Sequence, residues 1–181
     1  MINKAVLISI RPKWCEMIAN GKKTVEVRKT RPRLEPPFKC YIYCTQPKHP
    51  YDDFISVDRE DGTAGFFCGG KVICEFTCDD IRYANAFNFV VKEDGEKALE
   101  GSCIDKADLF EYLGWEKGKP RAECAPFYRW HISDLEVYDT PKELSEFSGL
   151  RHTKFGLEPV SLKRPPQNWC YVEKLEGDDH D

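Results

Sequence analysis

The chain has 181 residues, enough for one domain with a sizeable core. Charged residues make up 32% and aromatic residues 13%, which excludes a disordered chain, and no run approaches the ~20 apolar residues of a membrane span. The formal net charge is −4, yet residues 1–50 hold eleven Lys or Arg against three Asp or Glu. This basic first third favours a local phosphate-binding face over broad coating of nucleic acid.

The N-terminal residues lead directly into a strand-like pattern and lack the layout of a signal peptide, so we expect a cytoplasmic protein. Nine cysteines without a regular framework are expected to be thiols. Cys40 and Cys44, like Cys74 and Cys78, would share one strand face at about 13 Å, which is too far for one metal. The histidines form no ligand motif either, so no metal and no cofactor are predicted.

The first half of the chain is predicted to be mainly strand. Apolar and β-branched runs predict strands at residues 5–10, 23–29, 38–45 and 66–78. A short helix is expected after the first strand, because Trp14, Met17 and Ile18 lie at helical spacing and Gly21 follows as a stop signal. Residues 30–37 and 46–65 are expected to be loops, and Gly69-Gly70 indicates a bulge or bend within the fourth strand.

The second half has fewer clear signals. A helix is predicted at 105–113, with Ala107, Phe110 and Leu113 on one side and Gly114 as its stop. Strands are predicted at 126–133 and 168–173.

Two further segments lie between these strands. Residues 140–147 are typical of a short helix, since Thr140 can cap it, Pro141 fits its first position and Glu143 completes a capping box. Residues 149–166 are expected to be irregular. Many strands with few short helices favour a mainly antiparallel sheet curled towards a barrel.

The strand at 23–29 carries the most chemistry. Its two-residue alternation places Val25 and Val27 on one side and Thr24, Glu26 and Arg28 on the other. A hydroxyl, a carboxylate and a guanidinium in one row can recognise a phosphate or a base edge. The same pattern also fits a structural ion pair between Glu26 and Arg28.

The octapeptide Gly21-Lys22-Lys23-Thr24-Val25-Glu26-Val27-Arg28 resembles the Gly-x-Lys-x-x-Glu-x-Arg signature of the ASCH family. Flanking segments in the same order extend the resemblance over most of residues 4–173, and the late ones look like those of bacterial and prophage members. These flanking segments are Leu7–Pro12, Tyr41–Thr45, Gly70–Phe76, Leu144–Phe147 and Arg164–Val172.

The resemblance implies an α+β, mainly β fold: a PUA-like small β-barrel with short flanking helices. The length and the lack of a dividing linker predict one such domain over residues 1–175, followed by an acidic tail at 176–181. The implied role is binding of RNA or a nucleotide. Some small bacterial members are amidohydrolases acting on acetylated cytidine, and at least one behaves as a ribonuclease. The amidohydrolases carry a threonine, the proposed nucleophile, where this chain has Glu26.

Three hypotheses follow. In the first, the protein binds RNA or a nucleotide in a basic groove, through residues Lys22, Lys23, Glu26, Arg28, Tyr43, Gln167 and Trp169. In the second, it is a hydrolase of RNA or a modified nucleoside, with Lys23 and Glu26 as acid and base and Thr24 as a nucleophile. In the third, it is an adaptor that binds another protein through the loop at 46–65, where Tyr51 and Phe54 lie. No membrane association is expected, and the oligomeric state stays open.

Overall fold

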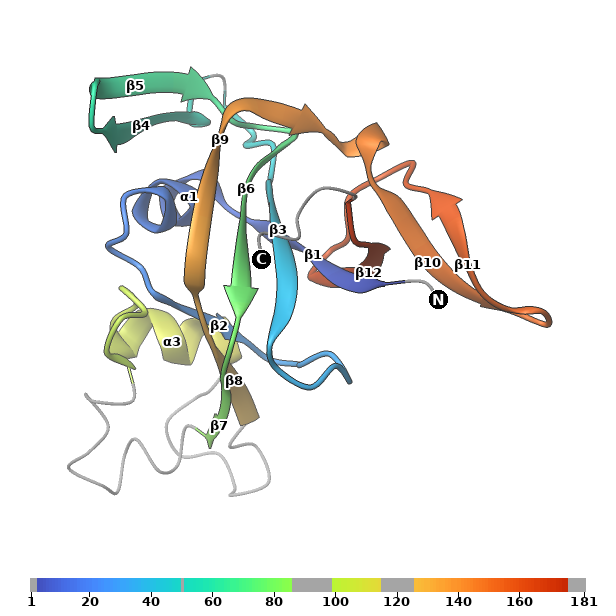
Figure 1. Ribbon diagram of the computed structural model, residues 1–181. Helices are drawn as coiled ribbons and strands as arrows, with labels where there is room; N and C mark the ends of the chain where they lie inside the picture. Colours follow the sequence, from blue (N-terminus) through green and yellow to red (C-terminus); the bar gives the residue numbers. More distant parts are fainter. Residues whose placement is uncertain (1–2, 50, 86–98, 115–125, 176–181) are drawn as a thin grey trace.

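The computed structural model describes residues 3–49, 51–85, 99–114 and 126–175 (Figure 1). Among these residues, two α-helices and the 3-10 turn η4 accompany the strands. The elements in chain order are β1 (Lys4–Ile10), α1 (Pro12–Ala19), β2 (Val25–Arg28), β3 (Phe38–Cys44), β4 (Phe54–Arg59), β5 (Gly62–Phe67), β6 (Lys71–Cys78), β7 (Ile81–Asn85), α3 (Lys106–Leu113), β8 (Pro126–His131), β9 (Ser133–Glu143), η4 (Leu144–Glu146), β10 (Ser148–Thr153), β11 (Gly156–Ser161) and β12 (Trp169–Glu173).

Three sheets make up the fold. The largest has seven strands in the order β11-β10-β12-β1-β3-β6-β9, beside a three-stranded sheet β2-β8-β7 and the hairpin β4-β5. All pairs are antiparallel except β1 with β3, which is parallel. Only Ile132 separates β8 from β9, so the chain passes directly from the small sheet to the large one. The mainly β prediction is confirmed, but the sheets do not close, and the barrel is therefore only approximate.

Strand β1 lies at the centre of the large sheet and is buried on both faces, which explains its unbroken apolar run. Val6 and Ile8 join the main core cluster together with Ile18 of α1. The alternate residues, Ala5 and Leu7, join a second cluster on the opposite face. The large sheet therefore separates two apolar layers, and α1 lies on the side that also carries β2.

Helix α3 lies against β2 and β8 (Figure 1). Asp105 caps it by accepting a hydrogen bond from the backbone N–H of Asp108 at 2.8 Å, and Gly114 ends it in the left-handed conformation. The helix at 105–113 is thus confirmed, but its buried side is not the one expected. Leu109 and Leu113, four residues apart, face the core. Of the expected combination, Ala107 is exposed and Phe110 is half-buried, because each step of three residues falls about 60° short of a full turn and moves off the face of Leu109 and Leu113.

The loop prediction at 46–65 is wrong for its second half, which forms the hairpin β4-β5. Ile55 and Val57 are buried in the main core, while Phe54 and Asp58, on the other face of the strand, are exposed. Asn20 fastens this hairpin to α1 by donating to the carbonyl of Ser56 at 2.8 Å. Polar and glycine residues on the outer face concealed the alternation of a half-buried strand.

The single strand predicted at 66–78 is two strands. β5 ends at Phe67, and β6 begins at Lys71 after a turn in which Gly70 has φ of 84°. Glycine reaches this left-handed conformation without steric cost, so the Gly69-Gly70 pair marks a break in the chain direction and not a bulge.

The helix predicted at 140–147 is wrong, because β9 runs through to Glu143 and pairs there with β6. Pro141 falls at a register irregularity, where the ladder does not require its missing N–H. A capping box does exist, but it joins Glu143 and Glu146 around the 3-10 turn. The irregular prediction at 149–166 is also wrong, since most of this segment forms β10 and β11. No helix among the described residues is long and apolar enough to cross a membrane.

Candidate functional site

The charged residues on β2 and just before it are buried and interconnected. Lys23, Glu26 and Arg28 are 4%, 7% and 9% exposed. The ammonium of Lys23 donates to the carbonyls of Val25 at 2.8 Å and Ser102 at 2.6 Å, and lies 3.2 Å from Glu26 Oε2. An ammonium has three donors, so these three acceptors fully engage Lys23.

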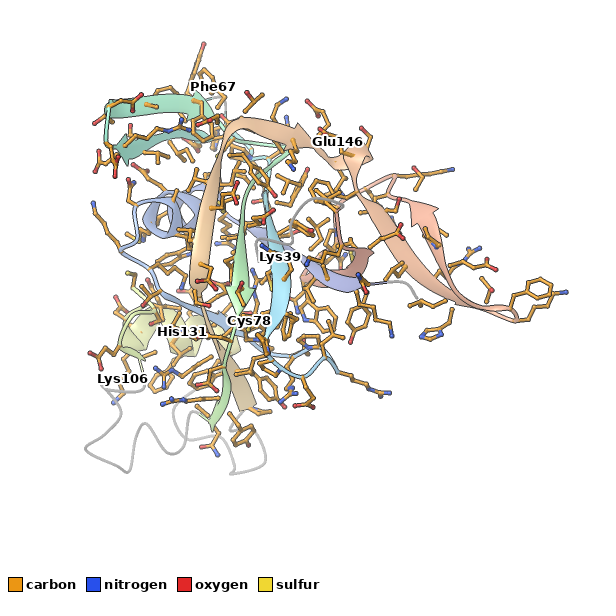
Figure 2. The ribbon with its side chains drawn as sticks, in the orientation of Figure 1. Lys39, Phe67, Cys78, Lys106, His131 and Glu146 are labelled. Atoms are coloured by element: carbon orange, nitrogen blue, oxygen red, sulfur yellow. The ribbon has the colours of Figure 1, made fainter. Side chains whose placement is uncertain are left out.

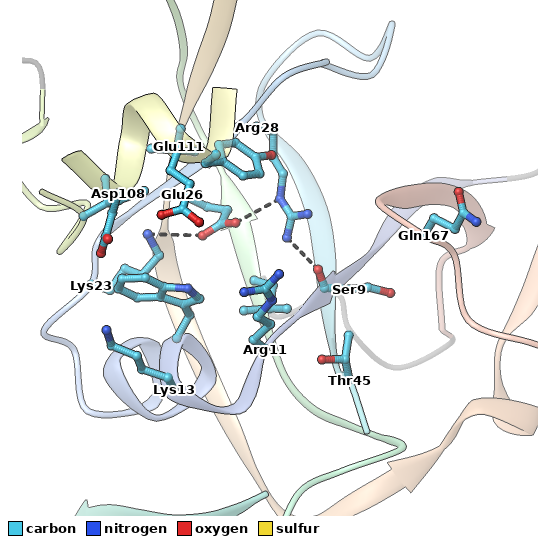
Figure 3. A pocket seen from close by; sticks show the side chains of 15 residues that line it. Ser9, Arg11, Lys13, Lys23, Glu26, Arg28, Thr45, Asp108, Glu111 and Gln167 are labelled. Carbon is cyan, nitrogen blue, oxygen red and sulfur yellow. Dashed lines mark hydrogen bonds and ion pairs between the residues drawn. The ribbon is translucent and has the colours of Figure 1, made fainter. Parts of the chain in front are cut away.

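Arg28 holds the other oxygen of the same carboxylate. Its Nε lies 2.9 Å from Glu26 Oε1 as an ion pair. Its Nη2 donates to the Ser9 carbonyl at 2.6 Å (Figure 3). Its Nη1 donates to Asn168 Oδ1 at 2.9 Å. Arg28 thereby ties β2 to β1 and to the segment before β12. Glu26 is fixed between two cations and keeps lone pairs that can accept from a ligand.

The backbone around residue 101 holds the start of β2 and the ammonium of Lys23 in place. The carbonyl of Gly101 accepts the backbone N–H groups of Thr24 and Val25 at 2.8 and 2.9 Å. Gly101 has φ of 75°, and a Cβ there would lie 2.4 Å from Thr24 Oγ1. Only glycine allows this close approach, so residue 101 positions the start of β2 and, through Ser102, the ammonium of Lys23.

A cavity of about 660 Å³ opens beside the charged row. This volume lies within the range of small-molecule sites, about 300–1,000 Å³. Its walls come from β1, β2, α1, α3 and the connections that follow β3 and precede β12 (Figure 3). The lining residues are Ser9, Ile10, Arg11, Lys13, Trp14, Lys23, Glu26, Val27, Arg28, Thr45, Ile104, Asp108, Glu111, Tyr112 and Gln167.

The cavity has two sides of opposite charge. Arg11 and Lys13 lie at the start of α1, where the first helical turn carries no acidic residue and the helix dipole adds positive potential. Asp108 and Glu111 face the cavity from α3. The α1 side therefore suits an anion such as phosphate, and the α3 side suits hydrogen-bond donors such as exocyclic amines or sugar hydroxyls.

Two aromatic rings border the cavity. Trp14 is half-buried, and the ammonium groups of Lys13 and Lys23 lie 4.7 and 5.2 Å from the centre of its ring. Tyr112 of α3 is exposed at the opposite wall. Partial burial raises the pKa of the Tyr112 hydroxyl, which keeps it a neutral donor at physiological pH.

Four of the residues predicted from the sequence line this cavity: Lys23, Glu26, Arg28 and Gln167. The first three form the connected floor described above. Gln167 lies at the far edge, on the segment that precedes β12 (Figure 3). Of the row predicted from the alternation, Glu26 and Arg28 lie on β2 beside an open space, Lys23 joins them from just before the strand, and Thr24 does not.

The other four predicted residues are placed elsewhere. Lys22 is exposed, and its carbonyl accepts from the thiol of Cys103 at 3.1 Å. Thr24 precedes β2 and lies against Gly101. Tyr43 is buried in the second core cluster, on the opposite face of the large sheet. Trp169 packs on Trp130, with ring centres 6.2 Å apart, and donates to Thr30 Oγ1 at 3.0 Å.

Sequence reasoning missed the α1 and α3 walls. Arg11 and Lys13 flank the proline that begins α1, directly after a buried strand, and this arrangement was a signal for a basic helix start. Asp108, Glu111 and Tyr112 lie three and four residues apart, so they share one face of the predicted helix. That polar face was visible in the sequence, but its position opposite β2 depends on tertiary contacts.

In the part of the chain that the structure describes, no group of three or more His, Cys, Asp or Glu side chains is arranged to hold a metal ion. Eight cysteines are described, and all are free thiols. Burial raises the pKa of Cys40, Cys74 and Cys78, the last to about 12, so these groups stay protonated and apolar in character.

Comparison with solved structures identifies the class of fold. The chain is similar to the crystal structure of ASCH from Zymomonas mobilis, with 18% identity, a TM-score of 0.52, and coverage of 94% of this chain and 88% of that one. Two variants of that protein, ZmASCH with a serine-to-alanine and with a tyrosine-to-phenylalanine substitution, give TM-scores of 0.54 and 0.51 at 16% and 17% identity. The matches cover 89% and 91% of those chains and 94% of this one. No family model and no curated protein matches the chain.

The chain therefore has the fold of an ASCH domain, and the likeness runs along almost its whole length. This confirms, at the level of the fold, the resemblance carried by the octapeptide at Gly21–Arg28 and its flanking segments. The likeness to bacterial and prophage members in particular stays a prediction.

Proposed function

We propose that this protein binds single-stranded RNA and holds one nucleotide of it in the cavity between α1, β2 and α3. The observation that carries the proposal is the convergence of Lys23, Glu26 and Arg28 on one open cavity of about 660 Å³ with a cationic and an acidic wall. An ion pair with a purely structural role would need no such space beside it.

Each wall has a part in this proposal. Arg11 and Lys13 hold the phosphate at the start of α1. Glu26 accepts from the base or ribose, since Lys23 and Arg28 position its carboxylate without using all its lone pairs. The exposed ring of Tyr112 offers a surface on which the base stacks, as aromatic side chains do in single-strand binding proteins.

The binding test is a titration of labelled single-stranded RNA, and separately of free nucleotides, at two salt concentrations. Arg11→Ala/Lys13→Ala is expected to weaken binding and to reduce the slope of log K against log salt by about 0.7 for each phosphate that the protein no longer neutralises. Lys4→Ala, an exposed lysine at the start of β1, is the matched control. Absence of binding by the wild type, or an unchanged slope in the double variant, would contradict the proposal.

A hydrolase with the same cavity is the alternative, and the geometry limits how it could work. Lys23 has no free donor, and Thr24 does not reach the cavity, so Glu26 would have to supply the acid–base chemistry. Incubation with acetylated cytidine and with RNA decides the matter. Turnover by the wild type that disappears in Glu26→Gln would favour the hydrolase, and intact substrate at high protein concentration would count against it.

The adaptor hypothesis corresponds to one surface feature. Tyr51, Phe54 and Phe67 are exposed, and the rings of Tyr51 and Phe54 each contact that of Phe67, with ring centres 6.1 and 5.2 Å apart. Phe67 is the last residue of β5 (Figure 2). A protein partner would dock on these rings, and such a complex would survive treatment with RNase. Dissociation on RNase treatment would instead assign the interaction to RNA.

A further inference from the structure

Strands β10 and β11 form a hairpin that projects from the body of the molecule (Figure 1). β10 pairs with β12 only at Gly149 opposite Val172, and beyond that point it pairs with β11 alone. Of the residues in these two strands, only Gly149 is buried. Because an isolated two-stranded hairpin is marginally stable in water, this extension adds little to the core, and its surface calls for another explanation.

That surface is cationic on an acidic protein. The segment 148–167 carries four Lys or Arg side chains and one carboxylate, Glu158, whereas the whole chain has a net charge of −4. All four cations are exposed, and none has an ion-pair partner among the described residues. They are Arg151, Lys154, Lys163 and Arg164.

An aromatic side chain accompanies these charges. Phe155, in the turn of the hairpin, is 81% exposed, and the ammonium of Lys154 lies 4.9 Å from the centre of its ring. A single exposed apolar side chain is ordinary by itself, so what matters is its position beside the cations of the hairpin. A cation beside an open aromatic face is the combination that single-stranded nucleic acid recognises through phosphate and base.

A short segment of chain connects the hairpin to the wall of the cavity. After β11 the chain returns past the base of the hairpin, where a Cβ on Gly149 would lie 2.7 Å from Leu162 Cδ2. Lys163 and Arg164 follow, and three residues later Gln167 lines the cavity (Figure 3). Exposed cations therefore lie along the segment that joins the hairpin to the site.

We propose that residues 148–164, here called the hairpin arm, bind the part of a single-stranded RNA that extends beyond the nucleotide in the cavity. Arg151, Lys154, Lys163 and Arg164 contact its phosphates, and Phe155 stacks on a base. This inference rests on the proposed function, because the cavity fixes one end of the strand. It adds that the ligand is a polymer and not a free nucleotide.

The test compares a dinucleotide with an oligonucleotide of about 12 nucleotides, within the range of about 4–16 known for single-strand sites. Phe155→Ala is expected to weaken binding of the longer RNA about fivefold or more, the effect of removing one base–aromatic stack. Arg151→Ala/Lys154→Ala is expected to reduce its salt slope by about 1.4. Neither variant should change the affinity for the dinucleotide, which reaches only the cavity.

Glu158→Ala changes the charge of the arm in the opposite direction from Arg151→Ala/Lys154→Ala, because it removes the one carboxylate of the arm. It is therefore expected to tighten binding of the longer RNA. If the wild type and the arm variants bind the longer RNA equally well, the proposal for the hairpin arm is overturned. If Arg11→Ala/Lys13→Ala still weakens binding of that RNA, the proposal for the cavity stands. If only the arm variants lose binding, and Arg11→Ala/Lys13→Ala does not, the arm is the RNA site and the proposal for the cavity is wrong. Competition by polyglutamate as strong as by RNA would also overturn the arm, because it would show recognition of charge alone. Apart from the half-buried Glu158, the variants change exposed residues, and circular dichroism checks that all of them fold.

Discussion

Glu26 owes its position to two buried cations, and this arrangement makes it structurally as well as chemically important. Removing one member of a buried ion-pair network leaves the remaining charges without compensation, which costs more than the network contributes as a whole. Lys23 and Arg28 would keep their backbone partners but lose the carboxylate between them.

Glu26→Ala is therefore expected to lower the free energy of unfolding by about 3–5 kcal/mol. Urea denaturation followed by circular dichroism measures the change. Glu35→Ala removes a carboxylate whose side chain is 88% exposed, and should stay within about 0.5 kcal/mol of the wild type. Equal small effects of both substitutions would show that the network on β2 is not buried as described.

The cysteines give a second prediction at this scale. Cys103 is exposed, whereas Cys40, Cys74 and Cys78 are buried with raised pKa values. Because the thiolate is the reactive form, iodoacetamide is expected to label Cys103 in the native protein and to spare these three until urea unfolds it. Mass spectrometry of the labelled peptides measures this, and rapid labelling of Cys74 in native buffer would contradict the burial.

At the scale of the element, α3 connects stability with the proposed site. Its cap, Asp105, and its core residues, Leu109 and Leu113, hold the helix against β2, and its opposite face supplies the acidic wall of the cavity. A helix of eight residues is not stable by itself in water, so the cap and the packing together decide whether this wall forms.

Asp105→Ala is expected to cost about 0.5–2 kcal/mol of stability, the usual value of an N-cap. Hydrogen exchange should accelerate in α3 more than in α1, and the affinity for RNA should fall with it. Asp105→Asn, which keeps a side-chain acceptor for the N–H of Asp108, should restore most of the loss. A uniform acceleration across the molecule would argue against a local role for this cap.

The helices and strands also show which parts of the fold could be predicted from sequence patterns. Strands with apolar runs, such as β1 and β3, and helices with stop signals, such as α1 and α3, could be predicted because burial and termination are local properties. The hairpins β4-β5 and β10-β11 could not, because their polar and glycine residues conceal the alternation. At the site, the charged row of β2 was visible in one strand. The walls required residues from α1 and α3 to meet across the fold.

At the scale of the whole molecule, the first and last strands pair with each other. β1 lies between β12 and β3, so residues from both ends of the described chain complete one sheet. On the second face of that sheet, Glu75 is buried and accepts from Lys39 and from the Tyr138 hydroxyl, each at 2.6 Å. This network joins β3, β6 and β9, and we propose that residues 1–175 are one cooperative domain.

Tyr138→Phe is expected to cost about 1–3 kcal/mol, because it removes a donor from the buried carboxylate of Glu75. Unfolding should nonetheless remain a single transition that coincides by tryptophan fluorescence and far-ultraviolet circular dichroism. Two separate transitions in the wild type would show that the small sheet with α3 unfolds independently, and would contradict the single-domain proposal.

The most direct test of the central claim is photo-crosslinking of single-stranded RNA containing thio-uridine, followed by mass spectrometry of the linked peptides. If one nucleotide lies in the cavity, cross-links will occur in the peptides that contain α1 and α3, with Tyr112 among the linked residues, and unlabelled RNA will compete for them. Cross-links confined to other surfaces, such as the β4-β5 hairpin, with none in α1 or α3, would contradict the assignment of this cavity as the RNA site.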